Sequence, residues 1–393
     1  MSDRSCENIN FKCKMLPLIT DMMKDRSKGK LGSIGKCKFQ TVKDFLSKQN
    51  YKQKESNIKL EKNQIIVAIG DIHADFLVLL GVLYLMDIID KKGYWIGGNT
   101  KVVFCGDLLD RYGRGNSVET NNMREEVDII QYLHSLNIES GGNIIWILGN
   151  HDLVRVLPLN GLKDVYKRYI GNQIEGWGED EEILFTSGGK MAEYIAYNSY
   201  LMVKIEEFVF MHGGLNIETI KKIYRDLHII EPKNFIEKVN REIFLELMGK
   251  NKVNKNITEL TFIRDFSNTK INKENDKKCK EEMSKIFPLL GMDWYKGSFV
   301  VGHSIQEYGV PFYCDGRVWR IDLGMSEAFG SNKEKIIGGI KIFQHKNEPF
   351  EVLVKINYSK RDINNYMLYM NGKYKKEKEE VLVAKWKRYL NIS

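Results

Sequence analysis

The chain has 393 residues, of which 43% are hydrophobic and 28% charged, so it can bury a substantial core. Its formal net charge of +8 suits anionic substrates, but the Lys residues are spread over loops and tails, which is only weak support for nucleic-acid binding. The longest apolar stretch, residues 76–89, is interrupted by Gly81 and Asp87 and is too short to span a bilayer. Residues 1–30 are polar and charged where a signal peptide would be apolar, and the six cysteines form no C-x-x-C pair. We therefore expect free thiols and an intracellular, cytoplasmic protein.

The chain is expected to divide into three parts. Residues 1–60 are Lys-rich and weakly periodic, which is typical of a basic amino-terminal extension. Residues 61–358 carry the regular pattern of a catalytic domain, with a helical insertion at about 216–297. Residues 359–393 form a basic tail with an amphipathic stretch at 381–390, which can dock on the body or on a partner.

Strand and helix patterns alternate in the first half of the catalytic domain. The expected strands are 64–69, 101–105 and 143–148, and the expected helices are 75–90, which Asp75 can cap, and 119–137. Such alternation predicts βαβ units and a partly parallel sheet. Open α/β sheets place their sites at the carboxyl ends of the strands.

The second half has a different pattern. Residues 201–205 and 208–211 are expected to form paired strands, and residues 216–290 are mostly helical. Further strands, expected to be antiparallel, are predicted at 298–301, 310–313, 318–321, 337–343 and 350–356. The predicted fold class is α/β, a central mixed β-sandwich flanked by helices in an α/β/β/α arrangement with a helical insertion.

Five short motifs follow apolar runs along most of the chain. They are Gly70-Asp71-Ile72-His73, Gly106-Asp107-Leu108-Leu109-Asp110-Arg111, Gly149-Asn150-His151-Asp152, His212-Gly213-Gly214 and Gly302-His303-Ser304. Any one of them alone is more often a turn or a helix cap than a functional element. Five in one coherent order, each offering oxygen or imidazole ligands after an expected strand, predict a metal site that hydrolyses a phosphate ester.

The motifs contain enough ligands for two divalent ions. Asp107 is the expected bridging ligand, because it follows the middle one of three parallel strands. The first ion is expected to bind Asp71, His73 and Asp107, and the second Asp107, Asn150, His212 and His303. Mixed oxygen and nitrogen ligands favour manganese, with iron or zinc as alternatives. Two such ions lower the pKa of a shared water and hold phosphate oxygens.

His151 is the expected general acid. Its side chain should project away from that of Asn150, toward the substrate, and Asp110 can hydrogen-bond its far nitrogen and hold it protonated. Asp110 could instead cap the next turn, but its place three residues beyond Asp107 favours the catalytic role.

Arginines are expected to bind the substrate phosphate. Arg111 follows Asp110 directly and can contact two phosphate oxygens. Arg264 is the candidate for a second arginine, because an apolar run leads into it, although a surface ion network with Asp265 is an equal alternative. Arg155, one helical turn beyond His151, is a weaker third option.

These motifs resemble those of the calcineurin-like metallophosphoesterase superfamily, phosphoprotein phosphatase type, and are most similar to its Shewanella-like, bacterial-type serine/threonine (or tyrosine) branch. The resemblance extends to residues 187–192 and 321–326 and covers roughly residues 63–345. It implies the same metal, acid and phosphate roles, with Arg264 placed by analogy of position. The chain departs from the family pattern at Ala74, Tyr112 and Asp152, none of which is a metal ligand.

The leading expectation is a metal-dependent phosphomonoesterase that uses a metal-activated hydroxide, with a protein phosphatase acting on phosphoproteins as the first choice. A nucleotide hydrolase, acting on a dinucleoside polyphosphate or an RNA cap, remains an alternative because the same core serves that chemistry. A catalytically inactive scaffold or binding protein is the second alternative. Nucleic-acid binding by the Lys-rich ends has weak support.

Overall fold

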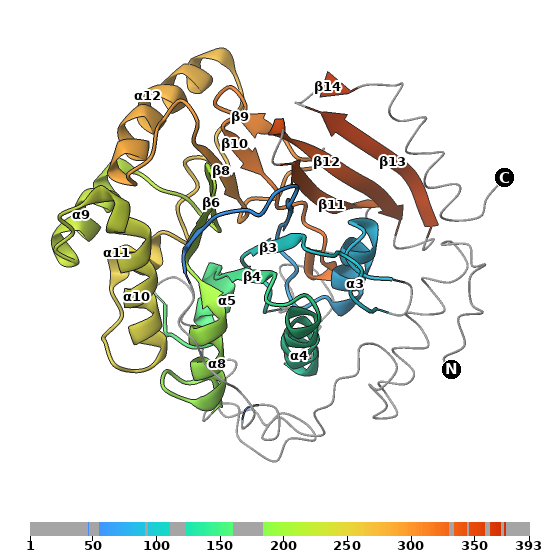
Figure 1. Ribbon diagram of the computed structural model, residues 1–393, viewed down its shortest axis with the longest axis horizontal. Coiled ribbons are helices and arrows are strands. Elements are labelled where there is room, and N and C mark those ends of the chain that lie inside the picture. Colours follow the sequence, from blue (N-terminus) through green and yellow to red (C-terminus); the bar gives the residue numbers. More distant parts are fainter. Residues whose placement is uncertain are drawn as a thin grey trace.

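The computed structural model describes residue 46 and residues 55–90, 93–110, 123–159, 184–307, 309–329, 334–343, 346–357, 362–370 and 373–374. Two β-sheets face each other at the centre, with β3 of one in contact with β7 of the other, and helices cover their outer faces (Figure 1). This is the mixed sandwich flanked by helices that the sequence predicts.

The larger sheet has eight strands in the order β14-β13-β12-β11-β2-β3-β4-β5. Its strands are β2 (Ile65–Ile69), β3 (Lys101–Cys105), β4 (Ile144–Ile147), β5 (Ser199–Tyr200), β11 (Glu334–Phe343), β12 (Lys346–Asn357), β13 (Asp362–Met370) and β14 (Lys373–Tyr374). The pairs β2–β3 and β3–β4 are parallel, as predicted, and both faces of these short strands are buried. Continuous apolar sequences are what such strands need, because helices and the second sheet cover them from both sides.

The smaller sheet has six strands in the order β1-β6-β7-β8-β10-β9. Its strands are β1 (Asn57–Ile58), β6 (Met202–Ile205), β7 (Phe208–Met211), β8 (Ser298–Val301), β9 (Phe312–Tyr313) and β10 (Val318–Arg320). The antiparallel expectation is wrong for β8, which pairs in parallel with both β7 and β10. The helices between β7 and β8 form the long crossover that a parallel pair requires.

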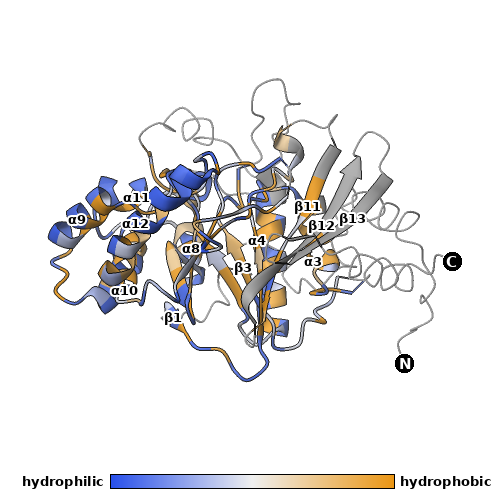
Figure 2. Ribbon diagram, turned by 90° about the horizontal axis from the view of Figure 1, so that it is seen from above, coloured by the Kyte–Doolittle hydropathy of each residue, from blue (hydrophilic) through white to orange (hydrophobic). Residues whose placement is uncertain are grey.

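The helices form two groups (Figures 1 and 2). The first comprises α3 (Phe76–Leu85), α4 (Met123–Glu139) and α5 (Asn150–Val154). Helix α8 (Lys190–Asn198) lies between the groups, in contact with β5 and with α10. The second comprises α9 (Ile217–Asp226), α10 (Phe235–Leu247), α11 (Lys255–Glu259) and α12 (Lys273–Leu289), together with the 3-10 turn η1 (Pro232–Asn234), which contacts α10 and α12. A second 3-10 turn, η2 (Glu327–Phe329), follows β10. Asp75 caps α3 by accepting a hydrogen bond from Val78 N at 3.2 Å, as predicted.

Each group covers one sheet. Helix α3 contacts β11 and α4 contacts β4 on the larger sheet, whereas α10 contacts β6 on the smaller one. The group α9–α12 lies at the opposite side of the molecule from α3 and α4 (Figure 1). This group is the helical insertion expected between residues 216 and 297.

Both ends of the expected catalytic domain continue into the sheets. Strand β1, from the amino-terminal extension, pairs in parallel with β6, and β13, from the tail, pairs antiparallel with β12. The amphipathic stretch 381–390 lies outside the described residues, so the three-part division stays a prediction. Among the described residues, no helix is both long and apolar enough to cross a membrane.

The cysteines differ from expectation at one place. Cys279 in α12 and Cys314 after β9 form a disulfide with their Cα atoms 5.6 Å apart. The two residues are separated by 35 positions and become neighbours only because α12 packs near the β9–β10 turn, so no local spacing indicates the pair. The cysteine argument for a reducing compartment therefore no longer holds. Cys105 is the buried core thiol that the sequence predicts.

Candidate active site

The five motifs meet at the carboxyl ends of strands from both sheets. Asp71, Asp107 and Asn150 follow β2, β3 and β4 of the larger sheet, and His212 and His303 follow β7 and β8 of the smaller one. All five side chains are buried. Residues from distant parts of the sequence therefore lie together in one cluster, as the motif order predicts.

Backbone hydrogen bonds join the first two motif loops. Asp107 O accepts bonds from Ile72 N at 3.0 Å and His73 N at 2.8 Å, and Leu108 O accepts one from Ala74 N at 2.7 Å. His73, Ala74 and Asp107 have φ values of 45°, 50° and 48°, in the left-handed region that side chains other than glycine seldom adopt. Left-handed backbone of this kind is concentrated at functional sites, where the surrounding structure holds it.

Two motif glycines allow residues of neighbouring motifs to lie close to the backbone. A Cβ at Gly149 would collide with the carboxylate and backbone amide of Asp107. A Cβ at Gly106, where φ is +92°, would collide with the ring of His212. The absence of side chains here allows the acidic and imidazole groups to reach the same space.

The first donor group consists of Asp71, His73 and Asp107. His73 Nε2 lies 3.8 Å from Asp71 Oδ2 and 3.6 Å from Asp107 Oδ2. The other ring nitrogen, Nδ1, lies 3.2 Å from Asp110 O and donates a hydrogen bond to it. That bond fixes the tautomer and leaves Nε2 as the ligand atom.

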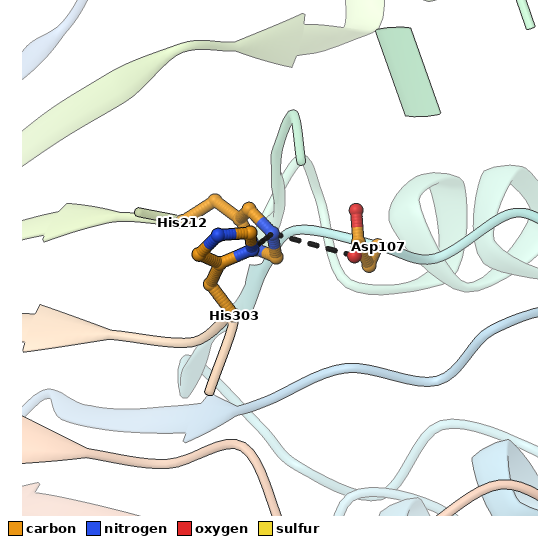
Figure 3. A group of neighbouring side chains, drawn as sticks. All are labelled: Asp107, His212 and His303. Atoms are coloured by element: carbon orange, nitrogen blue, oxygen red, sulfur yellow. Dashed lines mark hydrogen bonds and ion pairs between the residues drawn. The ribbon is translucent and has the colours of Figure 1, made fainter. Parts of the chain in front are cut away.

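The second donor group is centred on His212 (Figure 3). Its Nδ1 donates to Cys105 O at 2.9 Å, so Nε2 is the atom that faces the other donor groups. Nε2 lies 3.0 Å from Asn150 Oδ1, 3.3 Å from Asp107 Oδ2 and 3.1 Å from His303 Nδ1. Figure 3 shows Asp107, His212 and His303 converging from separate segments.

The donor set fits a pair of cations. His303 Nε2 lies 3.2 Å from Phe262 O, its acceptor, so its Nδ1 lone pair points toward the ligand atom of His212. A cation bound here could take one ligand atom from each of the two imidazoles and from Asp107. Because both donor groups include Asp107 and the ligand atoms of each lie within 4.8 Å of one another, one carboxylate can bridge two ions.

The electrostatics of the cluster are dominated by buried carboxylates. Burial, with repulsion from Asp322, raises the pKa of Asp71 well above its usual value. Burial by itself lowers the pKa of His212, but Asp107 and Asp71 outweigh it and raise that pKa to about 10. Burial and the neighbouring His212 lower the pKa of His303 to about 2. Bound cations would neutralise this concentrated negative charge.

His151 lies beside this cluster. Its Nδ1 is 2.5 Å from Asp110 Oδ2, and its backbone N donates to Asp107 Oδ1 at 2.9 Å. The side chain of His151 is 13% exposed and that of Asp110 1%, so the pair has a buried and an accessible end. Nε2 is the nitrogen left to meet a substrate. Asp110 has a φ of 65°. The turn after it, which Asp110 could instead cap, lies outside the described residues.

Of the two arginines expected to bind phosphate, Arg264 is described by the structure and Arg111 is not. Arg264 Nη1 donates to His303 O at 2.7 Å and to Ser304 Oγ at 2.8 Å, which places the guanidinium next to the second donor group. Asp265 accepts a bond from Asn216 instead of pairing with Arg264, so the surface-network alternative is not supported. Arg111 and Tyr112 lie outside the described residues.

Sequence reasoning missed a layer of supporting groups. Arg155 is buried and pairs with Glu126, so it does not face the cluster as the third phosphate-binding option required. Asp152 accepts bonds from Leu109 N at 2.8 Å and Gly149 N at 2.9 Å, joining two motif loops. The position of Asp152 within its motif is a usable signal, whereas nothing in the sequence around Glu126 indicates its partner.

Comparison with known proteins agrees with this geometry. A model of the calcineurin-like phosphoesterase family matches residues 65–307. Shewanella-like protein phosphatase 1 of Plasmodium berghei (strain Anka) is 25% identical over 322 residues, covering 78% of this chain and 78% of that protein. Shewanella-like protein phosphatase 2 of Arabidopsis thaliana is 24% identical over 323 residues, covering 71% and 76%.

A solved structure shares the fold. The crystal structure of the cold-active protein-tyrosine phosphatase of a psychrophilic Shewanella species matches with a TM-score of 0.53 and 18% identity, covering 81% of this chain and 83% of that one. Members of the family act with a pair of metal ions, and the two donor groups found here provide for them. The chain belongs to the calcineurin-like phosphoesterase family and is a phosphoester hydrolase.

Proposed function

We propose that this protein is a protein phosphatase that hydrolyses phosphomonoesters of phosphoproteins. The observation that carries the proposal is the position of Asp107, which belongs to both donor groups and adjoins the His151–Asp110 pair. The relatives named protein phosphatases span more than two thirds of the chain and support this substrate class. Neither the nucleotide hydrolase nor the inactive scaffold is favoured.

The metal assignment is part of the proposal. Asp71, His73 and Asp107 would hold one ion, and Asp107, Asn150, His212 and His303 the other. Manganese is preferred, with iron or zinc as alternatives, because the donors mix carboxylate, amide and imidazole groups. When bound, such a pair lowers the pKa of water and withdraws charge from phosphate oxygens.

The protein's own groups would complete the reaction. His151 would donate the Nε2 proton to the leaving oxygen, while Asp110 orients the ring through Nδ1. Arg264 would direct its remaining guanidinium donors at the phosphate, since Nη1 is anchored beside His303. Arg111 is proposed for the same task from its place in the motif.

The test is a substrate panel with the full chain loaded with manganese. Peptides carrying phosphoserine, phosphothreonine or phosphotyrosine would be compared with a dinucleoside tetraphosphate and a capped RNA. Turnover of at least one phosphopeptide well above that of the nucleotides is expected. Turnover of the nucleotides alone, or of no phosphoester with any of the three metals, would overturn the proposal.

A further inference from the structure

A buried ion pair contacts Asp110, the residue that pairs with the proposed general acid His151. Glu126 in α4 and Arg155 at the end of α5 are each 2% exposed, and Arg155 Nε lies 2.7 Å from Glu126 Oε2. The Arg155 guanidinium also stacks over the ring of Phe185 at 4.6 Å. Neither charge belongs to the metal-donor groups. A buried pair of this kind is a weak source of stability, because removing two charges from water costs about as much as their attraction returns.

The second oxygen of Glu126 contacts the catalytic loop. Glu126 Oε1 accepts a hydrogen bond from Asp110 N at 2.9 Å. The preceding amide, Leu109 N, donates to Asp152 Oδ1 at 2.8 Å. Two buried carboxylates from different helices thus hold consecutive amides of one turn.

The turn needs such support. Asp110 has a φ of 65°, a strained value for a residue with a side chain. Its carboxylate must nevertheless stay 2.5 Å from His151 Nδ1 to orient the ring. Small rotations of the backbone at Asp110 would move that carboxylate away from His151.

We propose that Glu126 is a positioning residue for proton transfer, which rests on the proposed role of His151 as general acid. By holding the Asp110 amide, Glu126 keeps the Asp110 carboxylate against His151, and Arg155 fixes Glu126 in turn. The contacts run from Arg155 through Glu126 and Asp110 to His151, and neither Arg155 nor Glu126 belongs to the metal-donor groups.

The proposal predicts a change that depends on the leaving group. Expulsion of p-nitrophenolate needs little help from an acid, whereas expulsion of phenolate or of a serine alkoxide requires a proton. Glu126→Ala should therefore lower kcat for phenyl phosphate by about 10- to 100-fold, part of the ~10²–10⁴-fold effect of general acid catalysis. The kcat for p-nitrophenyl phosphate should change much less, and metal content should stay at the wild-type level.

A second variant separates positioning from folding. Glu126→Leu combined with Arg155→Met replaces the ion pair by apolar groups of similar size, which is often neutral or stabilising. This double variant should fold, with its Tm lowered only by the loss of the hydrogen bond to the Asp110 amide. It should still lose phenyl phosphate turnover relative to p-nitrophenyl phosphate, because Leu cannot accept that bond. Met283→Ala, which truncates a fully buried side chain in α12, is the matched control for general destabilisation. It should leave the ratio of kcat for phenyl phosphate to kcat for p-nitrophenyl phosphate unchanged.

His151→Asn distinguishes the two hypotheses. If it reduces the phenyl to p-nitrophenyl ratio and the Glu126 variants do not, the positioning role is wrong and the acid role stands. If His151→Asn leaves the ratio unchanged, the acid assignment itself fails. Equal loss of both substrates in the Glu126 variants, or loss of metal, would also overturn the inference.

Discussion

His151 Nδ1 and Asp110 Oδ2 lie 2.5 Å apart, with the carboxylate buried and the imidazole at the edge of the pocket. This arrangement predicts that His151→Asn lowers kcat by about 10²–10⁴-fold, because Asn cannot supply the proton. Metal content should stay near that of the wild type, measured by elemental analysis. A matching loss of metal would show that His151 supports the ions instead of the proton transfer.

Arg264 is anchored beside His303 and is predicted to bind phosphate. Arg264→Ala should lower kcat/KM by about 10- to 100-fold, the cost of losing charge-assisted hydrogen bonds. Inorganic phosphate should also become a weaker competitive inhibitor. Arg241→Ala, at an exposed arginine of α10, is the control and should leave both values unchanged. An unaltered phosphate inhibition constant in Arg264→Ala would contradict the assignment.

Glu246 in α10 predicts a pH dependence of stability. Burial raises the pKa of Glu246 from 4.5 to about 8, and within the described part of the chain its Oε2 has no hydrogen-bond partner. The folded protein therefore keeps a proton that the unfolded chain loses as pH rises above 4.5, so stability falls between about pH 4.5 and pH 8 and then levels. Glu246→Gln cannot ionise, so its free energy of unfolding should increase relative to wild type across this window.

The comparison is made by urea unfolding of both proteins at several pH values. Glu237→Gln, at an exposed position of the same helix, serves as the control and should show no such trend. A constant difference between Glu246→Gln and wild type at all pH values would show that Glu246 is ionised when folded.

The bond between Cys279 and Cys314 joins residues 35 positions apart, across α12 and the β9–β10 turn. Cys279→Ser should lower the free energy of unfolding by about 2–4 kcal/mol under oxidising conditions. The reduced wild type should match the variant. Peptide mapping without reductant should recover the two cysteines in one linked pair, and alkylation of both would contradict the bond.

Strand positions were predictable where the apolar run was bounded by motif residues. The runs 101–105, 208–211 and 298–301 form strands with those bounds, because each ends where a ligand motif begins. The convergence of Asp71, Asp107 and Asn150 was also predictable, since parallel neighbours end at the same edge of a sheet.

Features that depend on packing between distant segments were not predictable. The parallel pairing of β8 depends on where the helical insertion returns the chain. The disulfide depends on how α12 lies against the β9–β10 turn, and the contact of Glu126 with the Asp110 amide depends on how α4 lies against the motif loop. In each case the local sequence is compatible with several partners.

Metal occupancy in the wild type and in Asp107→Asn tests the central claim most directly. After loading with manganese, elemental analysis and anomalous diffraction of the wild type should give about two ions per chain, with Asp107 a ligand of both. Asp107→Asn should lose both ions and its phosphoesterase activity, because one side chain belongs to both donor groups. Full occupancy in Asp107→Asn, or ions bound away from Asp107 in the wild type, would contradict the account.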